Sequence, residues 1–167
     1  MIFYIKICII LKYKKMENIK IIVTNSKARF NYFLSDFLEC GIELQGTEIK
    51  SLRKNGATLG DSYVIIRNGE IFIVNMHISC YEQGNIFNHE PNRTRKLLLH
   101  KSEILKLARK VSEKGFSIIP TKIYLKKGKA KVEIALGKGK KNYDKRETIK
   151  KRDDEREIAK AIKNFSR

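Results

Sequence analysis

The sequence has few cysteines, and they are placed where they cannot pair in a regular framework. Cys8, Cys40 and Cys80 are odd in number and widely spaced, and no C-x-x-C motif is present. This pattern excludes a disulfide-stabilised secreted domain and a cysteine-based structural metal site. We interpret it as a protein of a reducing compartment, the cytoplasm.

The sequence also lacks an apolar run long enough to span a membrane. Its longest, MIFYIKICIIL at residues 1–11, is interrupted by Lys6. It is about half of the roughly 20 residues that cross a bilayer, and no small-residue cleavage site follows. Met16 then opens MENIKIIVTN, which resembles an ordinary N-terminus. We therefore interpret residues 1–15 as an extension from an upstream start assignment, outside the fold, and expect no membrane partner.

Acidic residues are too few to balance the basic ones. The chain has 36 Lys and Arg against 18 Asp and Glu, a net charge of +18. Residues 137–167 hold twelve basic and six acidic residues, and residues 16–136 hold 20 and 12, so the excess is over twice as dense in the C-terminal segment. Such an excess favours polyanions, because binding phosphates releases their counterions. Judged from charge alone, nucleic acid is the first candidate class of partner, and an anionic membrane surface is the second.

No motif for catalysis or metal binding is present. His89-Glu90 lacks the second histidine of a zinc-protease helix, and GKGKK at residues 137–141 lacks the glycine spacing and Lys-Ser/Thr pair of a phosphate loop. We predict no catalytic residues, no cofactor and no metal. The enzymatic alternative is a nuclease on a small barrel, which would need clustered acids and usually a metal.

The strands are predicted mainly by two hairpins. Residues 61–76, DSYVIIRNGEIFIVNM, carry an Asn-Gly turn at 68–69, and alternating segments flank Lys-Gly at 127–128. A short β-branched strand is expected at residues 19–23. Short antiparallel strands with a few helices predict a mainly β fold with flanking α-helices, an OB-like antiparallel barrel over residues 16–136.

Two helices are predicted beside these strands. Ser26 can cap a helix over residues 27–40, where aromatic and leucine residues recur at helical spacing and Gly41 should end it. Apolar spacing over residues 101–114, followed by Gly115, predicts the second helix.

Residues 137–167 are predicted to be a tail that is disordered when free. Ile158, Ile162 and Phe165 would share one helical face, but such a thin stripe cannot offset the entropy of ordering the segment. Folding on a target is one interpretation, and a merely solubilising tail is the other.

A basic segment precedes the second helix. In HEPNRTRKLLLHKSEI, residues 89–104, Arg93, Arg95 and Lys96 follow Pro91 and lead into three leucines. This arrangement predicts a loop that presents guanidinium groups while the leucines anchor it. A strand with a solvated basic face is the alternative.

Five motifs in order resemble the SsrA-binding protein (SmpB) family. They are GIELQGTEIKSLR (41–53), DSYV (61–64), HISCY (77–81), HEPNRTRKLLLHKSEI (89–104) and GKGKKNYDKRETIKKRDDEREI (137–158). The resemblance runs from about Met16 to the end of the chain. Cys80 stands where relatives usually have proline.

The resemblance implies a non-enzymatic RNA-binding factor with an OB-like barrel. It implies binding to the tRNA-like domain of transfer-messenger RNA (tmRNA, or SsrA RNA), delivery with EF-Tu and GTP to stalled ribosomes for trans-translation, and a monomer when bound. The tail is expected to enter the empty mRNA channel and become helical there. The alternative is a generic ribosome-associated OB-fold RNA-binding protein.

The family's site positions can be transferred to this chain residue by residue. The RNA-binding residues that the resemblance implies are Lys27, Arg29, Tyr32, Glu39, Arg93, Arg95, Lys96, Leu98 and His100. The implied contacts with the ribosomal decoding centre and mRNA channel are Lys138, Lys140, Lys141, Asp144, Lys145, Arg146, Lys150, Lys151 and Arg152. For Glu39 two roles stay open: it accepts hydrogen bonds from base or ribose groups, or it only orients Arg29.

Overall fold

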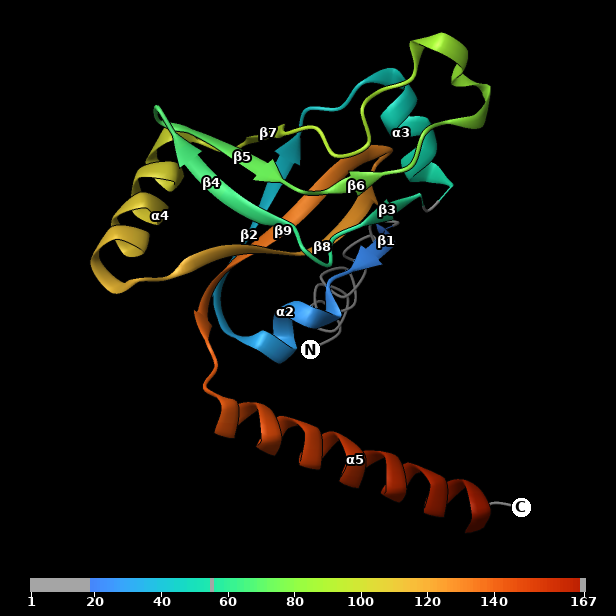
Figure 1. Cartoon of the computed structure of the whole chain (residues 1–167), viewed down its shortest axis with the longest axis vertical. Helices are drawn as coiled ribbons and strands as arrows, with labels where there is room; N and C mark the ends of the chain where they lie inside the picture. Colours follow the sequence, from blue (N-terminus) through green and yellow to red (C-terminus); the bar gives the residue numbers. More distant parts are fainter. Residues whose placement is uncertain (1–18, 55, 166–167) are drawn as a thin grey trace, which may run out of the picture.

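The fold is that of a computed structural model, which describes residues 19–54 and 56–165 (Figure 1). The predicted extension, residues 1–15, lies outside the described residues. In chain order the elements are β1 (Ile19–Thr24), α2 (Ser26–Asn31), β2 (Tyr32–Ile42), α3 (Gly46–Arg53), β3 (Ala57–Thr58), β4 (Tyr63–Arg67), β5 (Glu70–Val74), β6 (His77–Ile78), η1 (Glu82–Phe87), β7 (Arg95–Leu98), α4 (Lys101–Lys114), β8 (Ser117–Lys126), β9 (Lys129–Gly139) and α5 (Asn142–Phe165).

The main sheet closes on itself. Its strand order is β1-β8-β4-β5-β7-β2-β9 with every pair antiparallel, and β8 also pairs with β9. A bulge between Pro120 and Lys122 lets β8 pair with β4 before it and with β1 after it. Closure removes the exposed edges that an open sheet would leave. The predicted mainly β fold, an antiparallel barrel with flanking helices, is confirmed.

Both predicted hairpins are present. Asn68 and Gly69 have φ of 51° and 75° between β4 and β5, and Lys127 and Gly128 have φ of 52° and 76° between β8 and β9. Two successive residues with positive φ match the right-handed twist of the strands that they join. The predicted strand at residues 19–23 corresponds to β1.

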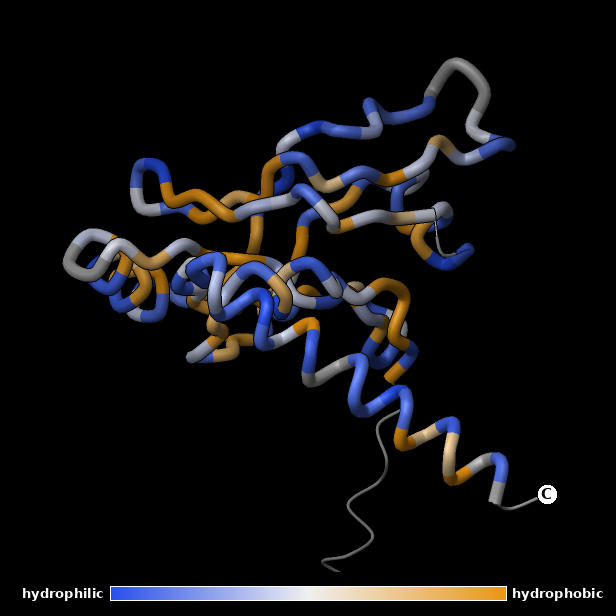
Figure 2. The backbone as a smooth tube through the Cα atoms, turned by 60° about the horizontal axis from the view of Figure 1, so that its bottom comes forward, coloured by the Kyte–Doolittle hydropathy of each residue, from blue (hydrophilic) through white to orange (hydrophobic). Residues whose placement is uncertain are grey.

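The core fills the barrel and the space beneath α4. In β9 the inward residues Val132, Ile134 and Leu136 are fully buried, and α4 adds Ile104 and Leu107. The tube in Figure 2 is accordingly most hydrophobic along the strands. As predicted, α4 spans residues 101–114 and ends at Gly115, whose φ of 61° is left-handed.

The prediction of a helix over residues 27–40 is wrong. The helix α2 ends at Asn31, and its cap is Asn25 rather than Ser26: the Asn25 side chain accepts a hydrogen bond from the Ala28 N–H at 3.1 Å. Strand β2 follows, with a bulge between Ser35 and Leu38. The aromatic and leucine positions fit helical spacing, but they also alternate in burial along a strand, and pairing with β9 selects the strand.

The C-terminal helix α5 extends away from the barrel (Figure 1). Strand β9 continues to Gly139, so the first residues assigned to the tail from the sequence pair with β2 instead. The Lys140 N–H then donates to the Asn31 carbonyl at 2.9 Å, and α5 begins at Asn142. The disorder of the free tail stays a prediction. Among the described residues, no helix has the length and apolar character to cross a membrane.

Candidate RNA-binding surface

One outer face of the barrel brings together side chains from four strands. Glu39 lies on β2 two residues before Gly41, which is in register with Leu98 on β7 and Lys131 on β9. Lys131 is in turn in register with Tyr124 on β8. Residues two apart on a strand point to the same side. We call this surface the Glu39 face and define it by Glu39, Leu98, Tyr124, Lys126 and Lys131.

Glu39 is held by three groups of this face. Its Oε2 accepts a hydrogen bond from the Tyr124 hydroxyl at 2.5 Å and one from Lys126 Nζ at 3.4 Å, and its Oε1 lies 3.7 Å from Lys131 Nζ. The Tyr124 hydrogen bond is the main cause that lowers the pKa of Glu39, and with the two lysines it outweighs partial burial. Among the interactions of the described residues, no hydrogen bond or ion pair joins Glu39 to Arg29, so the orienting role considered for Glu39 has no support.

Leu98 gives this face an exposed apolar group. The residue is 53% exposed, whereas its neighbour Leu97 is buried. A Cβ on Gly41 would lie 3.2 Å from the Leu98 Cβ, so the glycine lets the leucine lie flat against β2. His100 follows at the start of α4, where its backbone N–H donates to the Glu103 carboxylate at 3.0 Å and its ring is exposed. An exposed leucine beside basic groups can pack against a nucleic acid base or ribose.

A second group of candidate residues lies at α2, near the base of β2. Lys27 pairs with Asp61 at 3.1 Å, and both side chains are mostly exposed. Tyr32 is half-buried, and it lines with Lys27 a cleft of about 810 Å³ between α2, β4, α4 and β8. Arg29 is exposed on the other side of α2, facing α5. The structure therefore separates these three residues from the Glu39 face.

Lys140 connects this region to the C-terminal helix. Its Nζ donates to the Arg29 carbonyl at 3.0 Å and to the Thr148 hydroxyl at 3.3 Å, and it lies 5.0 Å from the centre of the Phe33 ring. Asp144 caps the start of α5 by accepting a hydrogen bond from the Lys141 N–H at 3.0 Å. The first turns of α5 are thus attached to α2, while its later part makes little contact with the barrel.

The other candidates of the tail are distributed along β9 and α5. Lys138 is exposed at the end of β9. Figure 2 shows α5 as mostly hydrophilic, with short apolar stretches towards its end. The remaining predicted channel residues in α5 are Lys145, Arg146, Lys150, Lys151 and Arg152.

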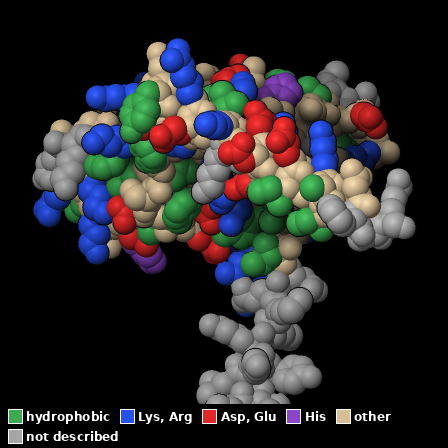
Figure 3. All heavy atoms as spheres, turned by 90° about the horizontal axis from the view of Figure 1, so that it is seen from below, with side chains coloured by type: hydrophobic (Ala, Val, Ile, Leu, Met, Phe, Trp, Pro, Cys, Tyr) green, Lys and Arg blue, Asp and Glu red, His purple; other side chains and the backbone are tan. Residues whose placement is uncertain are grey.

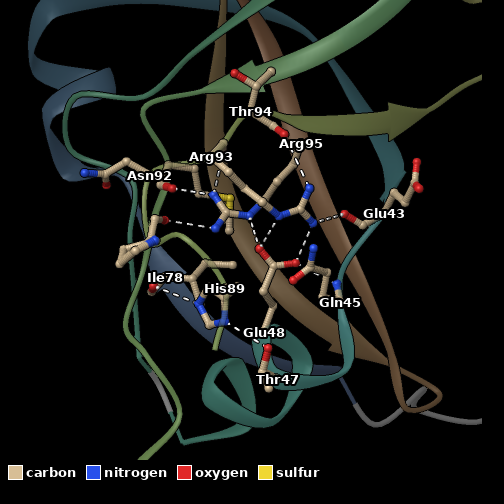
Figure 4. A network of polar contacts seen from close by, with 12 residues as sticks. Glu43, Gln45, Thr47, Glu48, Ile78, His89, Asn92, Arg93, Thr94 and Arg95 are labelled. Atoms are coloured by element: carbon tan, nitrogen blue, oxygen red, sulfur yellow. Dashed lines mark hydrogen bonds and ion pairs between the residues drawn. The ribbon is translucent and has the colours of Figure 1, made fainter. Parts of the chain in front are cut away.

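The basic segment before β7 is organised differently from the prediction (Figure 4). Glu48 of α3 is completely buried and accepts hydrogen bonds from Arg93 Nε and Nη2 at 2.8 and 2.6 Å and from Arg95 Nε at 2.8 Å. Arg95 also donates to the carbonyls of Met76, Arg93 and Pro91 at 2.6, 3.0 and 2.9 Å. We call Glu48, Arg93 and Arg95 the buried clamp. It joins α3 to the segment that leads into β7.

The clamp fixes the charge state of its carboxylate. Burial alone would raise the pKa of Glu48, but hydrogen bonds from Arg93, the Gln45 N–H and Arg95 keep it below its ordinary value. His89 supports the same segment: its Nε2 lies 3.1 Å from the Ile78 carbonyl and its Nδ1 3.0 Å from the Thr47 hydroxyl. Because a carbonyl only accepts, Nε2 carries the proton.

The expectation that Arg95 is presented to a ligand is therefore wrong. Arg95 is completely buried, because it supplies the counter-charge that Glu48 needs. The Arg93 side chain is 25% exposed and is engaged with the same carboxylate. Lys96 points to the outside of β7, where it pairs with Glu70. Arg93 and Arg95 thus stabilise the fold through Glu48, whereas Lys96 remains accessible to a ligand.

Basic and acidic groups are interspersed on the surface. In the view of Figure 3, Lys and Arg side chains are spread around the molecule, with acidic groups between them. Within the described residues no group of three or more His, Cys, Asp or Glu could hold a metal ion. The sequence interpretation missed Glu48, Tyr124, Lys126 and Lys131. Only the hairpin alternation at residues 121–136 indicated that Tyr124 and Lys131 lie on neighbouring strands.

Taken together, the fold and surface define a basic antiparallel β-barrel protein with an appended charged helix. The family model described as SmpB protein matches residues 22–164. The chain belongs to the SmpB family.

Its relatives match over nearly their whole length. An SsrA-binding protein of Caldicellulosiruptor saccharolyticus is 58% identical over 153 residues, 92% of this chain and 97% of the relative. One of Halothermothrix orenii is 54% identical over 151 residues, 90% of this chain and 97% of the relative. A solved structure described as "tmRNA-SmpB: a journey to the center of the bacterial ribosome" is 42% identical with a TM-score of 0.61, covering 72% of this chain and 85% of that chain.

Proposed function

We propose that this protein binds the tRNA-like domain of tmRNA and accompanies it, with EF-Tu and GTP, to stalled ribosomes in the cytoplasm. The barrel binds the RNA through the Glu39 face and its neighbours His100 and Lys96. The segment from Lys138 through α5 enters the mRNA channel next to the decoding centre. The protein acts as a monomer and without catalysis of its own.

The Glu39 face is the observation that carries this proposal. It combines an exposed leucine, an oriented carboxylate and two lysines from four strands. RNA loops are recognised by such mixtures, because unpaired bases offer both apolar faces and hydrogen-bonding edges. The names of the relatives, SsrA-binding protein, point to the same RNA.

Leu98 provides the sharpest test of the RNA-binding surface. Leu98→Ala should weaken binding to a transcript of the tRNA-like domain about tenfold or more, because burying a leucine against a ligand contributes roughly 1.5–3 kcal/mol. Leu105→Ala is the matched control, since Leu105 is 59% exposed on α4. Gel shifts with this transcript and with an elongator tRNA measure both effects. Equal affinities of the two variants would exclude the Glu39 face as the binding surface.

A truncation separates the two parts of the function. A chain that ends at Lys141 keeps all of β9, including its pairing with β2 up to Gly139. It should bind the tRNA-like domain within about threefold of the full chain, since the barrel is complete, yet fail to support tagging of peptides on stalled ribosomes. Loss of RNA binding in the same proportion as tagging would contradict this division.

RNA recovered with the protein from cells distinguishes the alternative. A generic ribosome-associated OB-fold protein would enrich ribosomal RNA without tmRNA. The proposed function requires tmRNA to be enriched over other small RNAs.

A further inference from the structure

Tyr124 reaches Glu39 across an intervening strand. The two residues lie on β8 and β2, and β9 runs between these strands with Lys131 opposite Tyr124. Adjacent strands are about 4.8 Å apart, so the two backbones are roughly 10 Å apart. The ring of Tyr124 is buried, with the residue only 5% exposed, and its hydroxyl ends at the Glu39 carboxylate.

This contact makes the two carboxylate oxygens of Glu39 unequal. Oε2 accepts from the Tyr124 hydroxyl and from Lys126 Nζ. Within the described part of the chain, Oε1 accepts no hydrogen bond, and Lys131 Nζ lies 3.7 Å from it. One oxygen is therefore anchored, and the other keeps its acceptor positions for a ligand on a side chain that is 37% exposed.

A lone carboxylate at an RNA-binding surface would repel the phosphates of the RNA. The basic groups around Glu39 offset this repulsion. Glu39 with Lys126 and Lys131 has a net charge of +1, and the nearby Glu133 is paired with Lys122 at 2.9 Å. The cluster as a whole attracts phosphates, although its centre is an acceptor. Carboxylates recognise bases by accepting from amino and imino groups, such as those of cytosine and guanine.

We propose that Tyr124 is a positioning residue for RNA binding: it anchors one oxygen of Glu39 so that the other accepts from the N–H edge of an unpaired base. Lys131 lies beside this acceptor and faces a phosphate of the same nucleotide. The inference rests on the proposed function and assigns the chemistry of one of its contacts. The lowered pKa of Glu39, caused first by the Tyr124 hydrogen bond, keeps the acceptor ionised.

A double-mutant cycle tests the coupling between the two residues. Tyr124→Phe keeps the buried ring and removes only the oxygen, and Glu39→Gln removes the charge. Each single change should weaken binding to the tRNA-like domain about fivefold to tenfold. The double variant should bind no more weakly than Glu39→Gln alone, because interacting residues are not additive. Tyr63→Phe is the matched control, since the Tyr63 hydroxyl makes no hydrogen bond within the described residues.

The outcomes separate this inference from the proposed function. If the unaltered protein does not bind the tRNA-like domain, the proposed function and the inference both fail. If it binds and Tyr124→Phe binds equally well, only the inference fails. If the double variant shows the product of the two single losses, Tyr124 acts independently of Glu39 and the positioning role is also refuted. Thermal melts of each variant confirm that the barrel is folded.

The pH dependence is a readout that a purely structural role would leave unchanged. The charged and titratable groups that face Glu39 are Tyr124 and Lys126 of β8 and Lys131 and Glu133 of β9. Without the tyrosine hydroxyl the pKa of Glu39 should rise, so its carboxylate is protonated at a higher pH. NMR titration of the Glu39 side chain should show this upward shift in Tyr124→Phe and none in Tyr63→Phe. An unchanged midpoint would overturn the proposal.

Discussion

Replacing Glu48 by glutamine should destabilise the protein strongly, because it leaves a buried guanidinium without its counter-charge. Both Glu48 and Arg95 are completely buried, and Arg95 cannot reach water without opening the segment before β7. Removing one partner of such a pair costs about 3–5 kcal/mol, out of a total stability of about 5–15 kcal/mol. For a folded part of this size the melting temperature should fall by about 10–20 °C.

Thermal and urea unfolding followed by circular dichroism measure this loss. Asp61→Asn is the control, because its ion pair with Lys27 has the same chemistry but the Asp61 side chain is 86% exposed. Surface pairs contribute about 0–1 kcal/mol, so the control should melt within a few degrees of the unaltered protein. A loss below 1 kcal/mol in Glu48→Gln would refute the interpretation of the buried clamp.

The destabilisation should also depend on pH in a defined direction. The pKa of Glu48 is lowered in the folded protein, so its contribution is complete above its unfolded pKa of about 4.3 and is lost as the pH falls towards the folded value. The difference in free energy of unfolding between the unaltered protein and Glu48→Gln should therefore narrow below about pH 4. A difference that stays constant down to pH 2 would contradict a clamp based on charge.

Three further predictions concern the rest of the chain. Lys140→Ala should speed amide exchange in the first turn of α5 several-fold without changing the melting temperature of the barrel, because it removes contacts to α2 and β2; unchanged exchange would contradict this role. Gly69→Ala should lower the free energy of unfolding, measured with urea, by about 1 kcal/mol, because alanine is strained at the φ of +75° found there. An unchanged urea midpoint would disprove this strain. In a Cys8→Ser background, a thiol reagent should modify Cys80 in the native state but not Cys40, because burial raises the Cys40 pKa to about 12; modification of both would refute this.

Features set by neighbouring residues could be predicted from the sequence. The turn at Asn68-Gly69 needs only two residues that tolerate positive φ, and α4 needs only its apolar spacing and Gly115. The helix predicted over residues 27–40 failed because its spacing also fits a strand, and the pairing with β9 that selects the strand joins residues about a hundred positions apart.

The candidate site divides in the same way. Family motifs indicate Glu39 and Leu98, but not the hydroxyl 85 positions away that orients the carboxylate. Arg95 was predicted to face a ligand because the sequence beside it is polar. Its partner Glu48 is 47 positions earlier, and no local pattern connects them.

The sequence by itself determined the basic character of the chain, its turns and its membership of the SmpB family, because composition and short motifs are local properties. The tertiary structure decided which charges are buried and which are presented. Barrel closure places distant strands side by side, and a charged group in the interior is stable only where such a neighbour supplies the opposite charge.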